Sequence, residues 1–319
     1  MGLLRNLLAF DQKKDTPDLL SVIEQAVSRV EPLLKQTSHY PEAYRKPIVN
    51  ALEYVSTLVL NVPGPIAVNF DSYAKDDYVH AIFPSIDSIP ETFRTSVALQ
   101  KYLRENYAGD ELYALMMMRR CEKIILGMEW SGQFIQRDVT QHVVYFTSHT
   151  IVDPAPDEAQ ARDRVTLGFL NNLLDKVAKR VALRKVARQA QLQEMDFLKA
   201  RLHVANAETH ADLEKKLSDM LLSLQNTTRS LELDAYLDDF EAVLLKPEQF
   251  LYLNQSPITL DRMGIRRDRD GSAQNEPIIF SDLIGFDRRN WTVTMVHCRN
   301  IQSETFSERL EAAYRMLSI

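Results

Sequence analysis

One stretch of this sequence constrains the fold more than any other: about 48 residues from Asp157 onward contain no proline and one glycine, Gly168. Leu, Val, Ala, Lys, Arg, Gln and Glu dominate it, and these residues favour helix. The sequence therefore predicts one long helix, which would extend about 70 Å if unbroken. That length exceeds the diameter of a compact body of 319 residues. We expect the helix either to protrude or to dimerise.

The apolar stripe of this helix is discontinuous. It runs at helical spacing from Leu170 to Val181, is interrupted by basic residues, and resumes with an offset near Leu192. A strict heptad repeat is therefore not predicted. Two further helices, at about 209–225 and 230–245, follow the long one, so a helical hairpin or bundle is expected.

Strand signals lie on both sides of the helices. Period-two alternation from Lys123 to Trp130, followed by Ser131-Gly132, predicts a β-hairpin. Its return segment, 133–152, is long enough to need a bulge or a second turn near 138–141. After the helices, further strands are predicted at 250–253, 258–260, 278–286 and, most clearly, 291–298.

The placement of these signals predicts the architecture. We expect an α+β protein that is predominantly helical, with antiparallel β regions flanking an inserted long-helix arm or bundle. Its parts would be an N-terminal helical layer plus β-hairpin region (1–156), the arm or bundle (157–246), and a C-terminal β region with a closing helix from Ser303 (247–319). The first and third parts are expected to form one body.

Signals in the N-terminal part are weaker. They predict helices at about 15–35 and 48–61, short strands at 66–70 and 78–83, and helices at 88–106 and 109–118. The spacing of Ser88 and Glu91 suggests a capping box at the start of the 88–106 helix.

The most unusual local chemistry is the segment 176–188, which contains six basic residues and no acidic one. On a helix they form one cationic stripe, the candidate binding residues Lys176, Lys179, Arg180, Arg184, Lys185 and Arg188. Such a stripe repels itself and needs negative charge nearby. The acidic segment Leu231–Glu241 could supply it within the fold; the alternatives are a protein partner, nucleic acid or lipid.

A second basic cluster comprises Arg262, Arg266, Arg267 and Arg269, and Arg288 and Arg289 follow it in the sequence. Arg266, Arg267 and Arg269 are secondary candidates for binding an anion. Aspartates, including Asp261, are interleaved with these arginines, so a solvated loop with locally neutralised charge is the simpler interpretation.

Catalytic and metal sites are not indicated. Two acid/base pairs are conceivable, Asp77 with His80 and His149 with Asp153, but each lacks a neighbouring nucleophile. The histidine pairs lack metal-ligand spacing, and no motif for a nucleotide or another cofactor is recognised. We predict no catalytic residues, no metal and no cofactor.

Charge and cysteine usage narrow the class of protein. A net charge of −6 excludes a globally basic nucleic-acid binder, and two distant cysteines favour a reducing compartment, the cytoplasm. We expect no transmembrane segment. The N-terminal residues Leu3, Leu4, Leu7 and Leu8 share one helical face, and this short amphipathic peptide could dock on a partner or on the protein's own core.

Together these features favour a non-enzymatic cytoplasmic interaction or scaffold protein that uses its helical segment to self-associate or to hold a protein partner. The alternative is a nucleic-acid-associated accessory protein that contacts phosphates through the stripe at 176–188.

Overall fold

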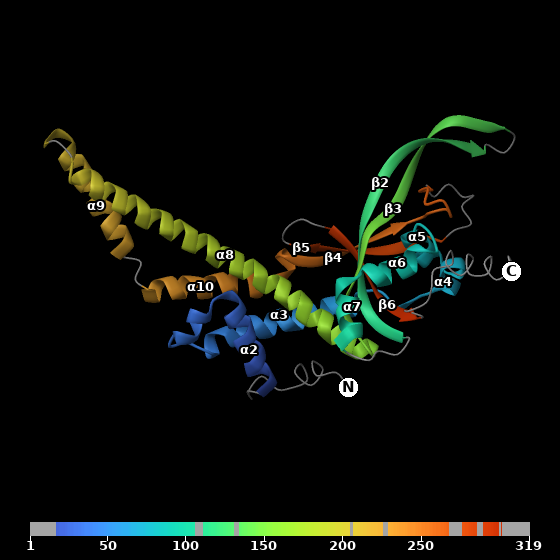
Figure 1. Cartoon of the computed structure of the whole chain (residues 1–319), viewed down its shortest axis with the longest axis horizontal. Helices are drawn as coiled ribbons and strands as arrows, with labels where there is room; N and C mark the ends of the chain where they lie inside the picture. The colour runs from blue at the N-terminus through green and yellow to red at the C-terminus, as the bar shows by residue number, and fades with distance from the viewer. Residues whose placement is uncertain are drawn as a thin grey trace, which may run out of the picture. The chain divides into compact units, whose positions relative to one another are not determined.

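The computed structural model describes residues 17–105, 111–130, 134–204, 207–225, 229–267, 276–285, 290–299 and 301. The chain forms two compact units, each built from segments distant in the sequence. One contains Val55–Gly168 and the described residues from Leu251 onward, and the other contains the described residues up to Tyr54 and Phe169–Phe250. Two helices, α3 (Glu42–Leu60) and α8 (Glu158–Leu202), belong partly to each unit (Figure 1).

The first unit is built on a single sheet. Its strands are β1 (Ile66–Val68), β2 (Glu111–Trp130), β3 (Ile135–Ala155), β4 (Leu251–Ile258), β5 (Ile278–Gly285) and β6 (Asn290–Arg299). The order is β3-β2-β6-β5-β4 with antiparallel neighbours, and β1 pairs in parallel with β6. The β regions before and after the helices therefore share one sheet, and the α+β fold class, with helix exceeding strand, is confirmed.

The predicted hairpin is β2 and β3. The register shifts between Gly127 and Met128, and Asp138 opposite this point has a φ of 58°, so the bulge predicted near 138–141 is confirmed. The prediction of a helix at 109–118 is wrong where the chain is described, because β2 pairs with β6 from Glu111 and with β3 from Tyr113. Met116 and Met118 are buried on one face and Leu115 on the other. A strand buried on both faces lacks alternation and resembles a buried helix in sequence.

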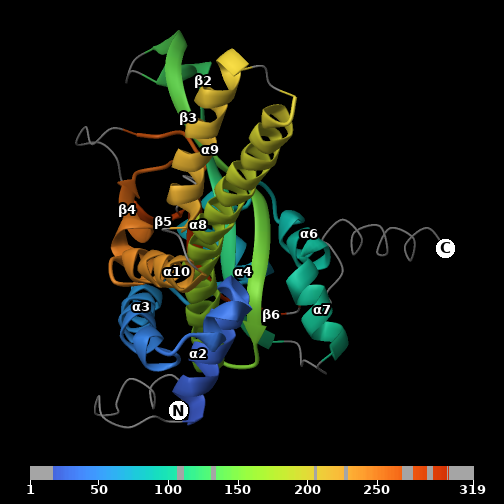
Figure 2. The same ribbon diagram turned by 90° about the vertical axis from the view of Figure 1, so that its left-hand side faces the viewer.

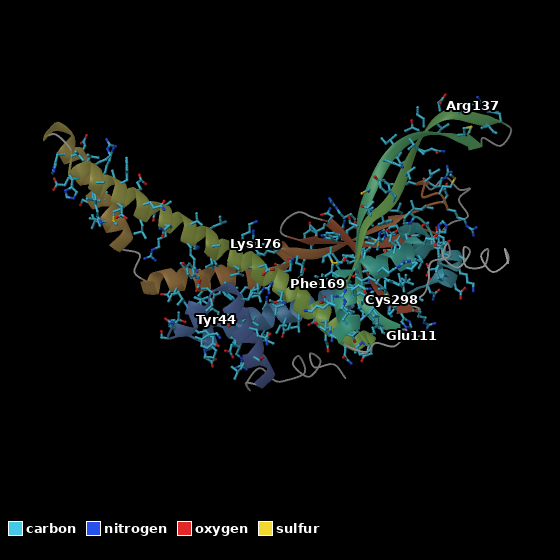
Figure 3. All side chains as sticks on the ribbon, viewed as in Figure 1. Tyr44, Glu111, Arg137, Phe169, Lys176 and Cys298 are labelled. Carbon is cyan, nitrogen blue, oxygen red and sulfur yellow. The ribbon has the colours of Figure 1, made fainter. Side chains whose placement is uncertain are left out.

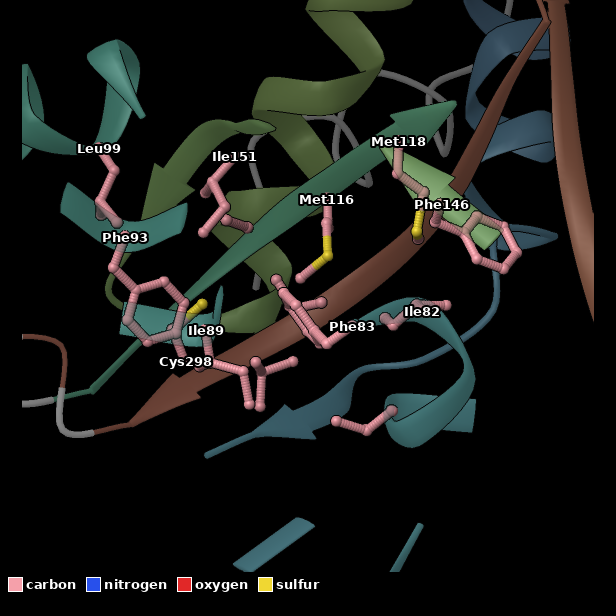
Figure 4. Close-up of a cluster of buried hydrophobic side chains, with 14 of the residues drawn as sticks. Ile82, Phe83, Ile89, Phe93, Leu99, Met116, Met118, Phe146, Ile151 and Cys298 are labelled. Atoms are coloured by element: carbon pink, nitrogen blue, oxygen red, sulfur yellow. The ribbon is translucent and has the colours of Figure 1, made fainter. Parts of the chain in front are cut away.

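Four short helices lie between β1 and β2: α4 (Phe70–Lys75), α5 (Asp77–Ile82), α6 (Ser88–Thr95) and α7 (Val97–Glu105). Phe93 of α6 and Phe83, the residue just after α5, form a buried cluster with Met116, Phe146 and Cys298 of the sheet (Figure 4). This cluster is the main apolar core of the unit.

Two sequence predictions in this layer are corrected. Residues 78–83 form most of helix α5 rather than a strand, because the Asp76 side chain caps it by accepting from the backbone N–H groups of Tyr78 (2.8 Å) and Val79 (3.3 Å). The predicted capping box at Ser88 is wrong, because Ser88 is already helical and its hydroxyl donates to the Ser85 carbonyl.

The helix predicted at 88–106 is broken at Ser96 into α6 and α7. The Ser96 hydroxyl donates to the Ile151 carbonyl (2.7 Å) and accepts from its N–H (3.2 Å), which attaches the break to β3. This tertiary contact explains why one predicted helix becomes two.

The end of α3 and the start of α8 meet at the chain entering β1. The Arg162 guanidinium donates to the carbonyls of Val59 (2.7 Å) and Gly64 (3.1 Å). Gly64 has a φ of 102°, and a Cβ here would lie 2.2 Å from the Met295 carbonyl oxygen. Only glycine fits this approach of the backbone to β6.

The second unit is helical. Its further elements are α2 (Pro17–Val30), the 3₁₀ turns η1 (Pro32–Gln36) and η2 (Pro247–Gln249), α9 (Ala207–Gln225) and α10 (Arg229–Leu244). The long helix predicted from Asp157 is confirmed as α8, and the two helices predicted after it are confirmed as α9 and α10.

Packing in the second unit centres on α3, α8 and α10 (Figure 2). The ring of Tyr44 in α3 meets that of Phe240 in α10 edge-on at 5.2 Å. Asn50 donates to the last carbonyl of α10, that of Leu244, at 2.8 Å. Pro47, which the sequence suggested as punctuation before a helix, lies inside α3, so this helix begins earlier than predicted.

Candidate interaction surfaces

The basic stripe of α8 is used inside the helical unit. Arg180 and Arg184 both bond to the carboxylate of Asp239 in α10, with Nε–O distances of 2.8 and 2.5 Å. The Asp239 side chain is only 1% exposed. The predicted pairing of the stripe with the acidic segment Leu231–Glu241 is thus confirmed for these two arginines.

Lys185 pairs with a second buried carboxylate, Glu31, which lies between α2 and η1. The other Glu31 oxygen accepts from the backbone N–H of Leu33 at 3.2 Å and so caps η1. One carboxylate therefore orders the start of η1 and neutralises a lysine of α8.

The remaining stripe residues also lie in the helical unit. Lys176, labelled in Figure 3, lies over the ring of Phe250 at 5.8 Å. Near it, Arg29 of α2 forms a two-bond ion pair with Asp175, at 2.7 and 3.0 Å. Lys179 and Arg188 occupy the same helix and also have interactions. The charges that suggested a phosphate-binding face therefore contribute to packing around α8.

The described residues of the second basic cluster belong to a turn that the Asp261 carboxylate holds together. Arg267 donates to Asp261 at 2.8 Å, while the other Asp261 oxygen accepts from the N–H groups of Met263 and Ile265, both at 2.9 Å. The backbone N–H of Arg266 donates to the His142 carbonyl of β3 at 2.8 Å. The prediction that aspartates neutralise this cluster locally is confirmed for Arg267, which pairs with Asp261. Arg269 lies outside the described residues.

The histidines of the two conceivable acid/base pairs, His149 and His80, pack against aromatic rings. The Nε2 of His149 lies 2.7 Å from the Ile82 carbonyl, and its ring stacks on Phe83 at 5.1 Å. Burial lowers the pKa of His149 and raises that of Asp153. The His80 ring lies against Tyr73 at 4.9 Å. Within the described chain, no group of three or more His, Cys, Asp or Glu side chains could hold a metal ion.

One polar cluster lies at the edge of the first unit's core. The Asp282 carboxylate accepts from Arg120 (2.8 Å), Thr292 (2.7 Å) and Ser256 (3.3 Å). Each acceptor oxygen is satisfied by a neighbouring strand, so the cluster fixes strand register where β2 leaves the core.

An apolar face of distal α8 is exposed. Leu183, Val186 and Phe197 are 63%, 67% and 59% exposed, and Val204 just beyond the helix is also exposed. The three helical residues lie within about 60° of one another around the axis. We call these four residues the distal seam. Leu198, about 100° away from Phe197, is buried, so the seam is separate from the packed face of the helix.

Comparison of the chain with protein-family models, with curated proteins and with solved structures finds no match. Among the helices that the structure describes, none has an apolar stretch long enough to cross a membrane.

Sequence reasoning missed the distal seam, although its signal is present. The seam residues recur at intervals of 3, 11 and 7 residues, which are all helical periods. The stronger stripe through Leu192 and Leu198 masked this second, weaker one. The N-terminal peptide with Leu3, Leu4, Leu7 and Leu8, and the closing helix predicted from Ser303, lie outside the described residues.

Proposed function

We propose that this protein is a non-enzymatic interaction protein that holds a helix of a protein partner along the distal seam of α8. The observation that carries the proposal is the exposure of Leu183, Val186 and Phe197 on one face of a long helix. Apolar side chains at such spacing are the contacts through which amphipathic helices pair.

The surroundings of the seam specify the chemistry of the partner. Glu194 and Asp196 are exposed on the two sides of Phe197, and Asp196 also lies 3.9 Å from the Lys199 ammonium. Arg201 lies over the Phe197 ring at 5.7 Å but leaves most of it accessible. We therefore expect an amphipathic partner helix with an apolar stripe and basic residues beside it.

The nucleic-acid alternative has weaker support. Arg180, Arg184 and Lys185 already bond to buried carboxylates, so phosphate would have to compete with intramolecular ion pairs. A scaffold role in the cytoplasm remains part of the proposal, supported by the free thiols of Cys121 and Cys298.

The test is site-specific photo-crosslinking in cells with the full chain. A crosslinking amino acid replaces Val186 or Phe197 in the seam, or Gln191 or Lys199, which are exposed on other sides of the helix. We expect the seam positions to crosslink one protein, through a helical segment of the stated chemistry, about fivefold or more above the control positions.

A synthetic peptide of that segment completes the test. It should bind the purified protein, and Val186→Asp/Phe197→Asp should raise its Kd about tenfold or more, whereas Gln191→Asp, on another side of the helix, should not. Equal crosslinking at all four positions would refute the proposal. Crosslinks removed by nuclease would favour the nucleic-acid alternative instead.

A further inference from the structure

The distal part of the β2–β3 hairpin extends beyond the rest of its sheet. β6 pairs with β2 only as far as Met118, whereas β2 and β3 stay paired to Trp130 and Ile135. The remaining 12 residues of β2 span about 40 Å at the rise of an antiparallel strand. Figure 1 shows the two strands leaving the sheet together, and Figure 3 places Arg137 near their far end. We call this part the ribbon.

One face of the ribbon carries a row of exposed apolar side chains. Ile124, Leu126 and Met128 alternate along β2 and are 67%, 70% and 66% exposed. Ile135 of β3 lies opposite Trp130, so it is on the same face, and it is 58% exposed. Paired residues of adjacent strands point to the same side.

The opposite face exposes less apolar surface, since Ile125 and Tyr145 on it are 36% and 39% exposed. The Gln141 amide donates to the Met128 carbonyl at 3.2 Å and lies across Gly127, where a Cβ would meet it at 2.1 Å. The Lys123 ammonium lies over the Tyr145 ring at 5.3 Å. The two faces therefore differ, and the apolar row is the side that needs a cover.

The row is also separate from the core. Arg120 and Glu122 stand on the same face between the buried Met118 and the exposed Ile124. Arg120 is held by Asp282 at 2.8 Å. The exposed row is therefore a distinct patch and not the fringe of the core. Such patches usually mark interaction sites, and two-stranded ribbons are barely stable alone in water.

We propose that the apolar row packs face to face, antiparallel, against the same row of a second copy of this chain. Glu122 lies on the same face at the end of the row nearer the core, and Arg137, the cross-strand partner of Met128, lies on that face toward the far end, before Ile135. In this dimer the two-fold axis runs perpendicular to the strands, in the plane between the two ribbons, and crosses β2 midway between Ile124 and Leu126. This axis brings Glu122 of each copy near Arg137 of the other. It also sets Ile124 against Leu126.

The area agrees with a reversible dimer. The exposed side chains of the row present on the order of 500 Å² per copy, so the pair would bury about 1,000 Å², near the lower limit for a specific interface. A lipid surface suits the ribbon less well, because most of the backbone N–H and C=O groups along the outer edges of a two-stranded ribbon have no partner in hydrocarbon.

The test is sedimentation equilibrium of the full-length protein over a range of concentrations. The wild type should dimerise, and Leu126→Lys should raise the dimer dissociation constant about tenfold or more. Gln136→Lys, an exposed position on the opposite face, is the matched control and should leave it unchanged. Circular dichroism verifies that each variant is folded.

Charge reversal tests the orientation. Glu122→Arg and Arg137→Glu should each weaken the dimer, and the double variant should restore it, since both contacts are then re-formed with opposite signs. Wild-type protein that stays monomeric to about 100 μM, a concentration well above the dissociation constants of specific interfaces, would overturn the proposal. A dimer whose dissociation constant is unchanged by Leu126→Lys would also overturn it. If the wild type were monomeric and bound anionic vesicles, and the Leu126→Lys variant did not bind them, the row would be assigned to a membrane instead. The seam variant Val186→Asp/Phe197→Asp should leave this dimer intact, so the two proposals can fail separately.

Discussion

Three carboxylates, Asp239, Glu31 and Asp282, are buried in the described structure, and each bonds to a basic side chain. Their partners are Arg180 with Arg184, Lys185, and Arg120, respectively. Removing one member of such a group leaves a charge or a polar atom uncompensated in a buried place. At the scale of residues, these three buried ion-pair groups therefore hold strands and helices in position.

His149 gives the first unit a pH-dependent stability. Burial lowers its pKa below the ordinary value of 6.5, so the folded state keeps the ring neutral while the unfolded state takes up a proton near pH 6.5. This contribution is present above pH 6.5 and is lost as the pH falls toward the folded-state pKa. We expect His149→Phe to lose less stability than the wild type between pH 7.5 and 5.5.

Urea unfolding at both pH values measures this difference. His149→Phe should itself be about 1 kcal/mol less stable at pH 7.5, because the Ile82 carbonyl loses its partner. His203→Phe, at an exposed position, should keep the wild-type pH dependence. An unchanged pH dependence in His149→Phe would show that this ring does not control it.

At the scale of elements, the pairing of α8 with α10 makes a direct prediction. Arg180→Glu/Arg184→Glu would place two carboxylates against the buried Asp239, so we expect a loss of about 2 to 4 kcal/mol in the free energy of unfolding. Part of this loss should be recovered at high salt, which screens the repulsion.

Denaturant unfolding checks this prediction. Lys215→Glu/Lys216→Glu makes the same charge change at exposed positions of α9 and should cost less than about 0.5 kcal/mol. If the double arginine variant kept its stability and instead abolished a salt-sensitive shift of nucleic acid on a gel, the intramolecular pairing would not be the main role of these arginines.

Among the helices, local sequence patterns were sufficient to predict some elements and not others. The long helix α8 was predictable because 45 residues without proline leave a helix few places to stop. Residues 78–83 were not, because an apolar run of six fits a strand or a helix equally well. The Asp76 cap decided for helix.

At the scale of the whole molecule, the sheet joins segments that are far apart in the sequence. β6, near the end of the described chain, lies between β2 and β5 and also pairs with β1. We therefore expect a fragment of residues 1–155 to show no cooperative thermal transition, because β1 and β2 would both lack β6, the strand with which they pair.

Circular dichroism of the fragment against the full chain measures this. Co-expression with residues 156–319 should restore a folded complex if the missing strands are the cause. A fragment that melts cooperatively at the wild-type midpoint would show that residues 1–155 fold without β6.

The sequence by itself determined the α+β class, the hairpin with its bulge, the long helix and its two successors, because each follows from periodicity and from turn residues within a short window. Tertiary structure decided what those patterns leave open. It made 111–118 a strand by pairing it with β6 and, from Tyr113, also with β3, and it split the helix at Ser96 through a bond to Ile151. It also left the distal seam and the ribbon's apolar row uncovered. Burial depends on which distant segments pack together, and a local pattern does not contain that information.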